Sequence, residues 1–425
     1  MFTNSKLKEL SFLVYGLGLS GQSVVKFFKK KKIKNYEVWD DKQKNLHKDK
    51  RTKNLKKTLK RVDYVVLSPG ISINNKKILI KFKKKIITDI DFLYLTNKKF
   101  KSIVVTGTNG KSTTCKLISH LLKKNKFKVL LGGNIGTPIL DLKITKDVYV
   151  VIEASSFQLS HSKYIQPDYA ILLNITNDHL DWHGNLMNYM NSKLKIFKSQ
   201  KKNQFALING KLEKIFKKQN FFSKLVVPKE KIYKKIKYKI KNHYLKSNIN
   251  NENMSFTYTF SKLLKISKKS FISSMSSFVG LPHRYEIFLK KKNIIFINDS
   301  KATSFESAKY ALSNSKNVYW ILGGKPKKND KIFLSGIKKN IIKCYVVGKN
   351  TKFFQSQIQN KISYSIAKNQ KKALIEILTE IKLSDVREST ILLSPAAASY
   401  DQFINFEKRG DDFKKLSKFY ARKFI

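Results

Sequence analysis

Acidic residues are scarce in this chain. Its 425 residues include 29 Asp and Glu against 87 Lys and Arg, which gives a formal net charge of +58. Such a charge is typical of proteins that bind nucleic acid or an anionic membrane. The lysines are spread along the whole chain instead of forming one patch, and Ile and Asn are abundant too. We therefore interpret the charge as a compositional bias of the surface, and we expect no obligate nucleic-acid partner.

Cysteine and long apolar runs are also lacking. Two cysteines, Cys115 and Cys344, cannot form a disulfide framework and fit a reducing compartment. No run of about 18 or more apolar residues is present, so no membrane span is expected. The apolar run at 12–15 is too short for a signal peptide and leads directly into glycines. These absences predict a cytoplasmic protein.

The residues that are present favour a large α/β protein. An apolar fraction of 41% with 12% aromatic residues is enough for packed cores, and the length suggests two or three domains. Expected strands alternate with amphipathic helices, and polar residues follow the strands. This alternation predicts parallel sheets with active-site groups at the strand ends.

The clearest motif is the sequence VVTGTNGKST at residues 104–113. It reads as a buried strand, a glycine-flanked loop and a helix, and it matches a shortened phosphate loop. Gly107 and Gly110 allow backbone N–H groups to turn toward a polyphosphate. Lys111 reaches the outer phosphates, and Ser112 or Thr113 supplies a hydroxyl for magnesium.

A second glycine motif, GLGLSG at residues 16–21, follows the first expected strand. An acidic pair, Asp40 and Asp41, ends the next strand about 20 residues later. This arrangement is typical of a loop that binds the pyrophosphate of NAD, but the pyrophosphate of a UDP-sugar would fit equally well. The motif alone does not choose between them.

Other polar residues stand at expected strand ends of the middle region. Glu153 ends a strand beside the phosphate loop, where a magnesium ligand is expected. His179 follows another strand with acids on both sides, which favours a metal or phosphate role. Lys193 and Lys195 lie on the following helix, and the residues alone do not distinguish them.

The rest of the chain gives coarser expectations. Residues 210–250 are lysine-rich with interspersed aromatics and suggest irregular strands, and a helix is expected at about 254–265. Residues 280–286 suggest a hinge. A further α/β unit follows, with polar motifs beginning at Asp299, Gly323 and Ser394. The helix after residues 16–21 is expected to bury Val24, Val25, Phe27 and Phe28. The last helix of the chain is expected to bury Phe413, Leu416, Phe419 and Tyr420.

Taken together, the motifs resemble the Mur ligases of peptidoglycan synthesis, nearly from end to end. The segment from Ser394-Pro395-Ala396 to Asp401-Gln402-Phe403 most resembles the D-glutamate-adding branch, and the Asp-Asn-Pro-Arg motif of the diamino-acid-adding relatives is absent. The motifs that carry the resemblance are, in order, 16–21, 68–71, 107–113, 132–136, 153–159, 174–181, 281–286, 298–303, 323–327 and 392–403.

The resemblance implies three domains. Residues 1–98 would form a Rossmann-like UDP-binding domain, 99–280 a central phosphate-loop ATPase domain, and 281–425 a C-terminal Rossmann-like domain that binds the amino acid. The implied activity is the ATP-dependent addition of D-glutamate to UDP-N-acetylmuramoyl-L-alanine through an acyl phosphate, by a monomer. The cofactors would be two Mg²⁺ ions.

The resemblance also implies roles for residues that match the family's motifs. The expected metal ligands are Ser112, Thr113, Glu153, His179 and a carbamylated Lys193, the last chosen by its register before Ile196-Phe197. Lys111, Glu153, His179 and Lys193 form the expected catalytic group. Expected ATP contacts are Gly107, Thr108, Asn109, Gly110, Lys111, Ser112, Thr113, Asn253, Arg284, Asp299 and Lys301. Expected contacts to the UDP-substrate are Leu19, Ser20, Asp41, Lys42, Gly70 and Asn134, and those to D-glutamate are Thr303, Lys327, Ser394 and Phe403.

The chain departs from the family pattern at residues 247–253. The family's G-x-H-N-x-x-N stretch, which packs against adenine, here lacks the Gly and the His but keeps Asn250 and Asn253. Lys42 also replaces a usual arginine and loses bidentate geometry. Rival interpretations are an NAD-dependent oxidoreductase, a nucleic-acid-dependent ATPase, another Mur-family ligase and a folylpolyglutamate synthase-like ligase.

Overall fold

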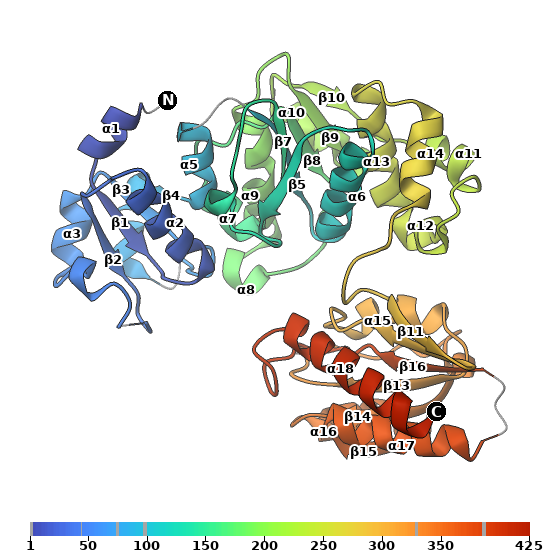
Figure 1. Cartoon of the computed structure of the whole chain (residues 1–425). Helices are drawn as coiled ribbons and strands as arrows, with labels where there is room; N and C mark the ends of the chain where they lie inside the picture. Colours follow the sequence, from blue (N-terminus) through green and yellow to red (C-terminus); the bar gives the residue numbers. More distant parts are fainter. Residues whose placement is uncertain (1–2, 44, 74–75, 97–99, 328–329, 385–387) are drawn as a thin grey trace. The chain divides into compact units, whose positions relative to one another are not determined.

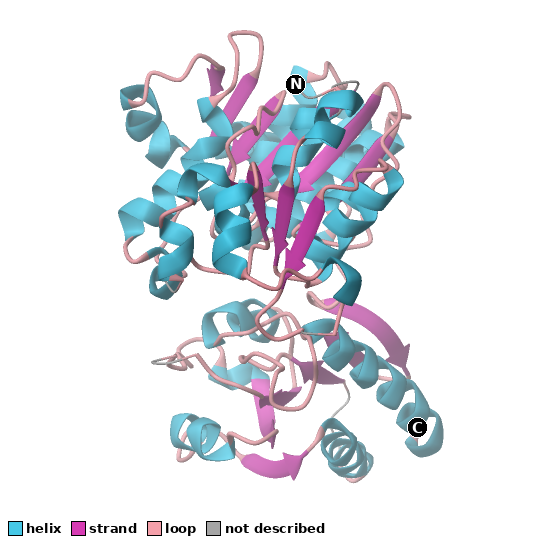
Figure 2. Cartoon of the chain, turned by 90° about the vertical axis from the view of Figure 1, so that its left-hand side faces the viewer, coloured by secondary structure: helices cyan, strands magenta, loops and turns pink. Residues whose placement is uncertain are grey.

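The computed structural model describes residues 3–43, 45–73, 76–96, 100–327, 330–384 and 388–425. The chain divides into two compact units, Met1–Phe278 and Val279–Ile425, each treated separately below (Figure 1). Helices and strands alternate through both units (Figure 2). Among the described residues, no helix is long and apolar enough to cross a membrane.

The first sheet of the first unit is parallel, with the strand order β2-β1-β3-β4. Its strands are β1 (Phe12–Tyr15), β2 (Tyr36–Trp39), β3 (Tyr64–Leu67) and β4 (Ile86–Ile87). The accompanying helices are α1 (Asn4–Glu9), α2 (Leu19–Lys30), α3 (Leu55–Arg61), α4 (Lys77–Ile80) and α5 (Asp89–Thr96). A Cβ on Gly21 would lie 1.8 Å from the Gly16 carbonyl oxygen, so only glycine lets α2 pack on the loop after β1.

The second sheet is also parallel, with the order β10-β9-β8-β5-β7-β6. Its strands are β5 (Phe100–Thr106), β6 (Val129–Gly133), β7 (Val148–Glu153), β8 (Tyr169–Leu172), β9 (Phe205–Ile208) and β10 (Lys224–Val226). The helices are α6 (Lys111–Lys124), α7 (Ser156–His161), α8 (Leu180–His183), α9 (Leu186–Lys198), α10 (Glu213–Lys218), α11 (Glu230–Lys237), α12 (His243–Lys246), α13 (Asn251–Leu263) and α14 (Lys268–Ser276). One face packs against α6, α13 and α14, and the other against α7 and α9 (Figure 1).

Residues 210–250 are mostly helical, so the expectation of irregular strands there was wrong. Only β10 is a strand, while α10, α11 and α12 occupy much of the rest. Tyr233, Ile236 and Ile240 are buried and recur at helical spacing, with lysines between them. The buried stripe therefore explains the helix, and the lysines mark its solvated side.

The two sheets of the first unit are joined around α5. The Asp91 carboxylate accepts hydrogen bonds from the backbone N–H groups of Lys163 and Tyr164, at 2.9 and 2.8 Å. The hydroxyls of Thr88 and Ser162 lie 2.8 Å apart. The division of this unit into two domains at residues 98 and 99 stays a prediction.

The second unit contains one six-stranded sheet with the order β11-β12-β16-β13-β14-β15. Its strands are β11 (Glu286–Lys291), β12 (Ile294–Asn298), β13 (Val318–Gly323), β14 (Ile341–Val347), β15 (Tyr364–Lys368) and β16 (Ser389–Leu393). The helices are α15 (Phe305–Ser313), α16 (Thr351–Ile358), α17 (Gln370–Lys382) and α18 (Phe406–Phe424). Only β11 pairs antiparallel among the described strands of this sheet.

Two expectations about buried aromatic residues on helices need correction. On α18, Phe413 and Tyr420 are buried, but Phe419 is 61% exposed. Phe419 lies six residues after Phe413, which at about 100° per residue turns it about 120° away from the buried face. On α2, Phe28 is buried while Phe27 is only half-buried.

Candidate active site

The phosphate loop of the first unit connects β5 to α6, so the expected strand, loop and helix are confirmed. Asn174, the second residue after β8, holds this loop in place. The Thr108 N–H donates to the Asn174 carbonyl oxygen at 2.9 Å. The Asn109 N–H donates to Asn174 Oδ1 at 2.8 Å. The loop is therefore shaped by its neighbouring strand end.

Gly110 and Asn253 are in direct contact on the other side of the loop. Gly110 has φ = +83°, and a Cβ there would lie 2.2 Å from Asn253 Oδ1. The same amide oxygen accepts a hydrogen bond from Thr114 Oγ1 at 3.2 Å. The structure thus places Asn253, a predicted nucleotide contact, against the phosphate loop.

Lys111 is half-buried at the start of α6. Its Nζ donates to the carbonyl oxygens of Gly107 and Thr108, at 2.9 and 2.8 Å. The neighbouring residues Ser112 and Thr113 are buried in the first turn of the helix. The ammonium group therefore lies over the loop where an anionic ligand would need it.

Glu153 ends β7, the strand that pairs with β5. Its side chain is 3% exposed, and Oε1 accepts a hydrogen bond from Asn134 Nδ2 at 3.0 Å. Oε2 is buried and has no hydrogen-bond partner in the described part of the chain. An unsatisfied buried carboxylate oxygen is costly, and a hard cation would satisfy it.

Protein groups of the described ranges do not form a complete metal site by themselves. Within the described ranges, no three or more His, Cys, Asp and Glu side chains are grouped closely enough to hold a metal ion. The candidate donors are Glu153 Oε2, at the end of β7 beside β5, and the hydroxyls of Ser112 and Thr113 at the start of α6, which are oxygen ligands of the kind that Mg²⁺ prefers. The donor set fits Mg²⁺ that is shared with phosphate oxygens.

Lys193 on α9 is a buried lysine beside the phosphate loop, with 1% of its surface exposed. Its Nζ donates to the Gly107 carbonyl oxygen at 2.8 Å and lies 4.6 Å from the centroid of the Tyr189 ring. Burial, together with the charge of Lys111, lowers the pKa of Lys193 to about 6. At pH 7 this amine is therefore mostly neutral and nucleophilic.

Lys195 points elsewhere. Its Nζ donates to the Ser160 carbonyl oxygen, and burial followed by the charge of Lys83 lowers its pKa to about 8. Residues two positions apart on a helix point about 200° away from one another, so Lys193 and Lys195 lie on different faces of α9. Only Lys193 contacts the phosphate loop.

His179 lies in the segment between β8 and α8. Its backbone is left-handed, with φ = +53°, and its side chain is about half exposed. Nε2 lies 3.5 Å from the Asp178 carboxylate, and the ring centroid lies 4.7 Å from that of Phe157. The structure places His179 beside an acid and an aromatic ring from α7.

Most of the predicted UDP-substrate residues lie at one edge of the first sheet. Leu19 and Ser20 follow β1, Asp41 and Lys42 follow β2, and Gly70 follows β3. These three parallel strands are neighbours, so their carboxyl ends meet at the same edge.

Asp40, the residue before Asp41, shapes this edge. Its carboxylate accepts a hydrogen bond from the Leu17 N–H at 2.7 Å. Asp41 accepts hydrogen bonds from the Tyr15 hydroxyl and the Trp39 ring N–H, and it forms a 3.0 Å ion pair with Lys76. Asn134 lies instead on the second sheet, beside Glu153.

In the second unit, Asp299 and Ser394 are in direct contact after the neighbouring strands β12 and β16. Ser394 Oγ donates to Asp299 Oδ2 at 2.7 Å, and the Tyr285 N–H donates to Oδ1 at 3.1 Å. Burial raises the pKa of Asp299 to about 7. Arg284, another predicted site residue, is the nearby positive charge that opposes this rise.

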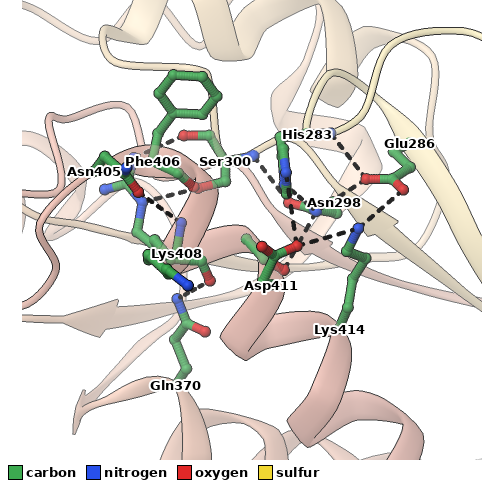
Figure 3. A network of polar contacts seen from close by, with 12 residues as sticks. His283, Glu286, Asn298, Ser300, Gln370, Asn405, Phe406, Lys408, Asp411 and Lys414 are labelled. Atoms are coloured by element: carbon green, nitrogen blue, oxygen red, sulfur yellow. Dashed lines mark hydrogen bonds and ion pairs between the residues drawn. The ribbon is translucent and has the colours of Figure 1, made fainter. Parts of the chain in front are cut away.

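The start of α18 is tied to the same strand ends by the polar network of Figure 3. Asn298 lies 2.9 Å from the His283 ring nitrogen and donates to Glu286, which also pairs with Lys414. Ser300 Oγ donates to the Phe406 carbonyl oxygen at 2.8 Å. This network fixes residues 283–300 to the helix.

The remaining predicted residues of the second unit differ in exposure. Lys301 Nζ lies 4.8 Å from the Phe406 ring centroid. Thr303 and Phe403 are half-buried, and Lys327 is exposed. The closest association among the predicted residues of this unit is therefore that of Asp299 with Ser394.

Sequence reasoning missed three residues that shape the phosphate-loop region: Asn174, Tyr189 and Glu252. Tyr189 contacts both Thr108 and Lys193, and its position four residues before Lys193 was an available signal. Glu252 accepts hydrogen bonds from Asn174 and Asn209. It is an acid in an acid-poor chain, which was a second signal.

Comparisons with known proteins agree with these features. Residues 105–281 match the family model for the Mur ligase middle domain, and residues 10–88 match that for the Mur ligase MurD-like N-terminal domain. The chain is 36% identical to UDP-N-acetylmuramoylalanine–D-glutamate ligase of Wolbachia sp. subsp. Brugia malayi, over 97% of each chain. It is also 36% identical to the enzyme of that name from Rickettsia prowazekii, over 97% of this chain and 98% of the relative.

Solved structures support the fold. The MurF ligase of Thermotoga maritima in complex with ADP matches with a TM-score of 0.57 at 17% identity, covering 98% of this chain and 97% of that one. MurC from the same organism matches with a TM-score of 0.54 at 17% identity, covering 96% and 99%. At this identity the likeness concerns the fold alone.

Proposed function

This chain belongs to the Mur ligase family, and we propose that it is the ATP-dependent ligase that joins D-glutamate to UDP-N-acetylmuramoyl-L-alanine in peptidoglycan precursor synthesis. The observation that carries the proposal is the similarity to two ligases of that name over nearly the whole chain. The phosphate loop, with Lys111 above it and Glu153 beside it, supplies the matching chemistry.

The reaction has two steps. An oxygen of the substrate carboxylate attacks the γ-phosphorus of ATP, the bond to the β-phosphate oxygen breaks, and ADP leaves an acyl phosphate behind. The amine nitrogen of D-glutamate then attacks the acyl carbon, phosphate departs, and loss of a proton from nitrogen gives the amide. Positioning and charge neutralisation are the main catalytic contributions in phosphoryl transfer.

Residues of the first unit serve the first step. Lys111 turns from the loop carbonyls to the β- and γ-phosphate oxygens and neutralises charge that develops there. The loop from Gly107 to Gly110 holds the phosphates through its backbone. Ser112 or Thr113 and Glu153 would hold one Mg²⁺, and His179 and the carbamylated Lys193 would hold a second. The ions would supply further charge neutralisation when bound.

Lys193 is the residue that we assign to the carbamate. Its neutral amine attacks the carbon of CO₂ and loses a proton, which leaves an N-linked carboxylate. The change replaces a neutral amine next to Lys111 by an anion, and it places two anionic oxygens where a hard cation prefers them. Lys195 does not contact the phosphate loop, because its Nζ donates to the Ser160 carbonyl oxygen instead.

The other substrates are assigned by position. The edge formed by Leu19, Ser20, Asp41, Lys42 and Gly70 would hold the uridine diphosphate, with Asn134 toward the sugar. Thr303, Lys327, Ser394 and Phe403 would hold D-glutamate, and Arg284, Asp299 and Lys301 would contact the nucleotide. The protein would act as a cytoplasmic monomer, with domains at 1–98, 99–280 and 281–425.

The test is product formation with ATP, UDP-N-acetylmuramoyl-L-alanine and a panel of L- and D-amino acids, followed by mass spectrometry. We expect one product, with the mass increase of a glutamyl residue, only with D-glutamate and only with ATP. Product with another amino acid would instead assign the chain to a different activity of the family, and product with a folate substrate to a folylpolyglutamate synthase.

A further inference from the structure

The first turn of α13 contacts the phosphate loop although its sequence departs from the family pattern. Lys237 Nζ donates to Asn248 Oδ1 and Asn251 Oδ1, at 3.0 and 2.8 Å, and so fixes the start of the helix. Asn253 from the same turn lies against Gly110. This segment is therefore ordered and adjacent to the loop despite the missing Gly and His.

Glu252 links this helix to two strand ends. Its carboxylate oxygens accept hydrogen bonds from Asn174 Nδ2, after β8, and from Asn209 Nδ2, after β9. The side chain is half-buried, and no ion pair with it occurs within the described residues. An acid held in this way is unusual in a chain with 58 more basic than acidic residues.

The carboxylate helps to fix which way the Asn174 amide points, together with the Asn109 carbonyl oxygen, which accepts a hydrogen bond from the same Nδ2 at 3.3 Å. An ionised carboxylate only accepts hydrogen bonds, so it must face the NH₂ group of Asn174. That orientation leaves Oδ1 to accept the Asn109 N–H at 2.8 Å. A flipped amide would instead direct an NH₂ donor at the Asn109 N–H, which is also a donor. Glu252 thus influences the loop backbone through one intermediate side chain.

We propose that Glu252 is a positioning residue for the nucleotide, which fixes the Asn174 amide and through it the Asn109 backbone of the phosphate loop. The proposal rests on the proposed function and deepens it at the ATP site. Burial also raises the pKa of Glu252, and the hydrogen bonds from Asn174 and Asn209 oppose that rise.

The experiment compares Glu252→Ala and Glu252→Gln with the wild-type chain. For Glu252→Ala we expect the KM for ATP to rise about tenfold, because Asn174 Nδ2 loses its charged hydrogen-bond acceptor. The KM for D-glutamate should stay within about twofold of the wild-type value. Glu252→Gln keeps one acceptor oxygen for Asn174. Its KM for ATP should therefore lie between the wild-type value and that of Glu252→Ala.

Glu213→Gln is the matched control, because Glu213 is a helical acid of the same unit that pairs with Lys217 on the surface. Its KM for ATP should not change. A rise shared equally by the KM values for ATP and D-glutamate in Glu252→Gln would overturn the proposal, since it would indicate a general structural role.

Calorimetric titration with ATP alone separates this inference from the function. Wild-type protein that binds ATP, together with equally tight binding by Glu252→Ala, would refute the role of Glu252 and leave the ligase assignment intact. Failure of the wild-type protein to bind ATP would contradict the function itself.

Discussion

The phosphate-loop region of the first unit and the strand-end cluster of the second unit satisfy their buried charges in different ways. Glu153 keeps one buried oxygen without a partner, and Lys193 is buried with a pKa lowered to about 6. Asp299 in the second unit instead receives hydrogen bonds from Ser394 and from the Tyr285 backbone. The buried carboxylate of the first region therefore depends on a ligand to satisfy it, whereas that of the second region is satisfied by protein groups.

The largest effect should come from the first region. Lys111→Ala and Glu153→Ala should each lower kcat by about 10²–10³-fold, because Lys111 neutralises charge on the transferring phosphoryl group and Glu153 would hold the Mg²⁺ that does the same. Steady-state phosphate release measures the effect, and circular dichroism checks the fold. Near wild-type turnover in either variant would remove that residue from the mechanism.

Lys193→Ala should also reduce turnover severely, but it should be partly rescued. Short carboxylic acids such as formate or acetate would occupy the space of the carbamate and return anionic oxygens to the site. Lys195→Ala is the matched control, since its side chain leaves the other face of the same helix. Equal loss and equal rescue in both variants would contradict the assignment.

In the second unit, Ser394→Ala should lower the stability of the protein as well as its binding of D-glutamate. The Ser394 hydroxyl is buried and donates to the buried Asp299 carboxyl group. Loss of that hydrogen bond should lower the free energy of unfolding by about 1–3 kcal/mol. Urea denaturation measures the change, and Ser356→Ala, on the exposed side of α16, serves as the control. An unchanged midpoint would show that Asp299 does not need this donor.

A pH dependence of stability should come from Lys193, measured in buffer depleted of CO₂. The folded chain holds this lysine neutral above about pH 6, while the unfolded chain binds a proton up to its ordinary pKa. The unfolded state therefore binds more protons, and the free energy of unfolding rises with pH across this window. Lys193→Met should flatten that rise. An unaltered slope would mean that Lys193 is not neutral in the fold.

The sequence was sufficient for local features that obey short-range rules. Alternating strands and helices, the loop at Gly107–Lys111 and the acid at Glu153 were all predictable, because parallel strands bring their carboxyl ends to one edge. The helical nature of residues 230–237 was missed because lysines obscured the apolar stripe through Tyr233 and Ile236.

Contacts between distant segments were not predictable in the same way. The residues alone did not decide whether Lys193 or Lys195 has the functional role. The answer depends on which face of α9 meets the Gly107 carbonyl oxygen. The link from Glu252 through Asn174 to Asn109 joins segments up to 143 residues apart, and no local pattern encodes it.

The central claim is that this chain activates a carboxylate by phosphorylating it. The most direct test uses UDP-N-acetylmuramoyl-L-alanine labelled with oxygen-18 in its carboxylate, together with ATP and D-glutamate. Attack of the carboxylate on the γ-phosphorus predicts that the released phosphate carries a single oxygen-18 atom. Unlabelled phosphate released alongside the amide product would contradict the acyl-phosphate route and with it the account of the phosphate-loop region.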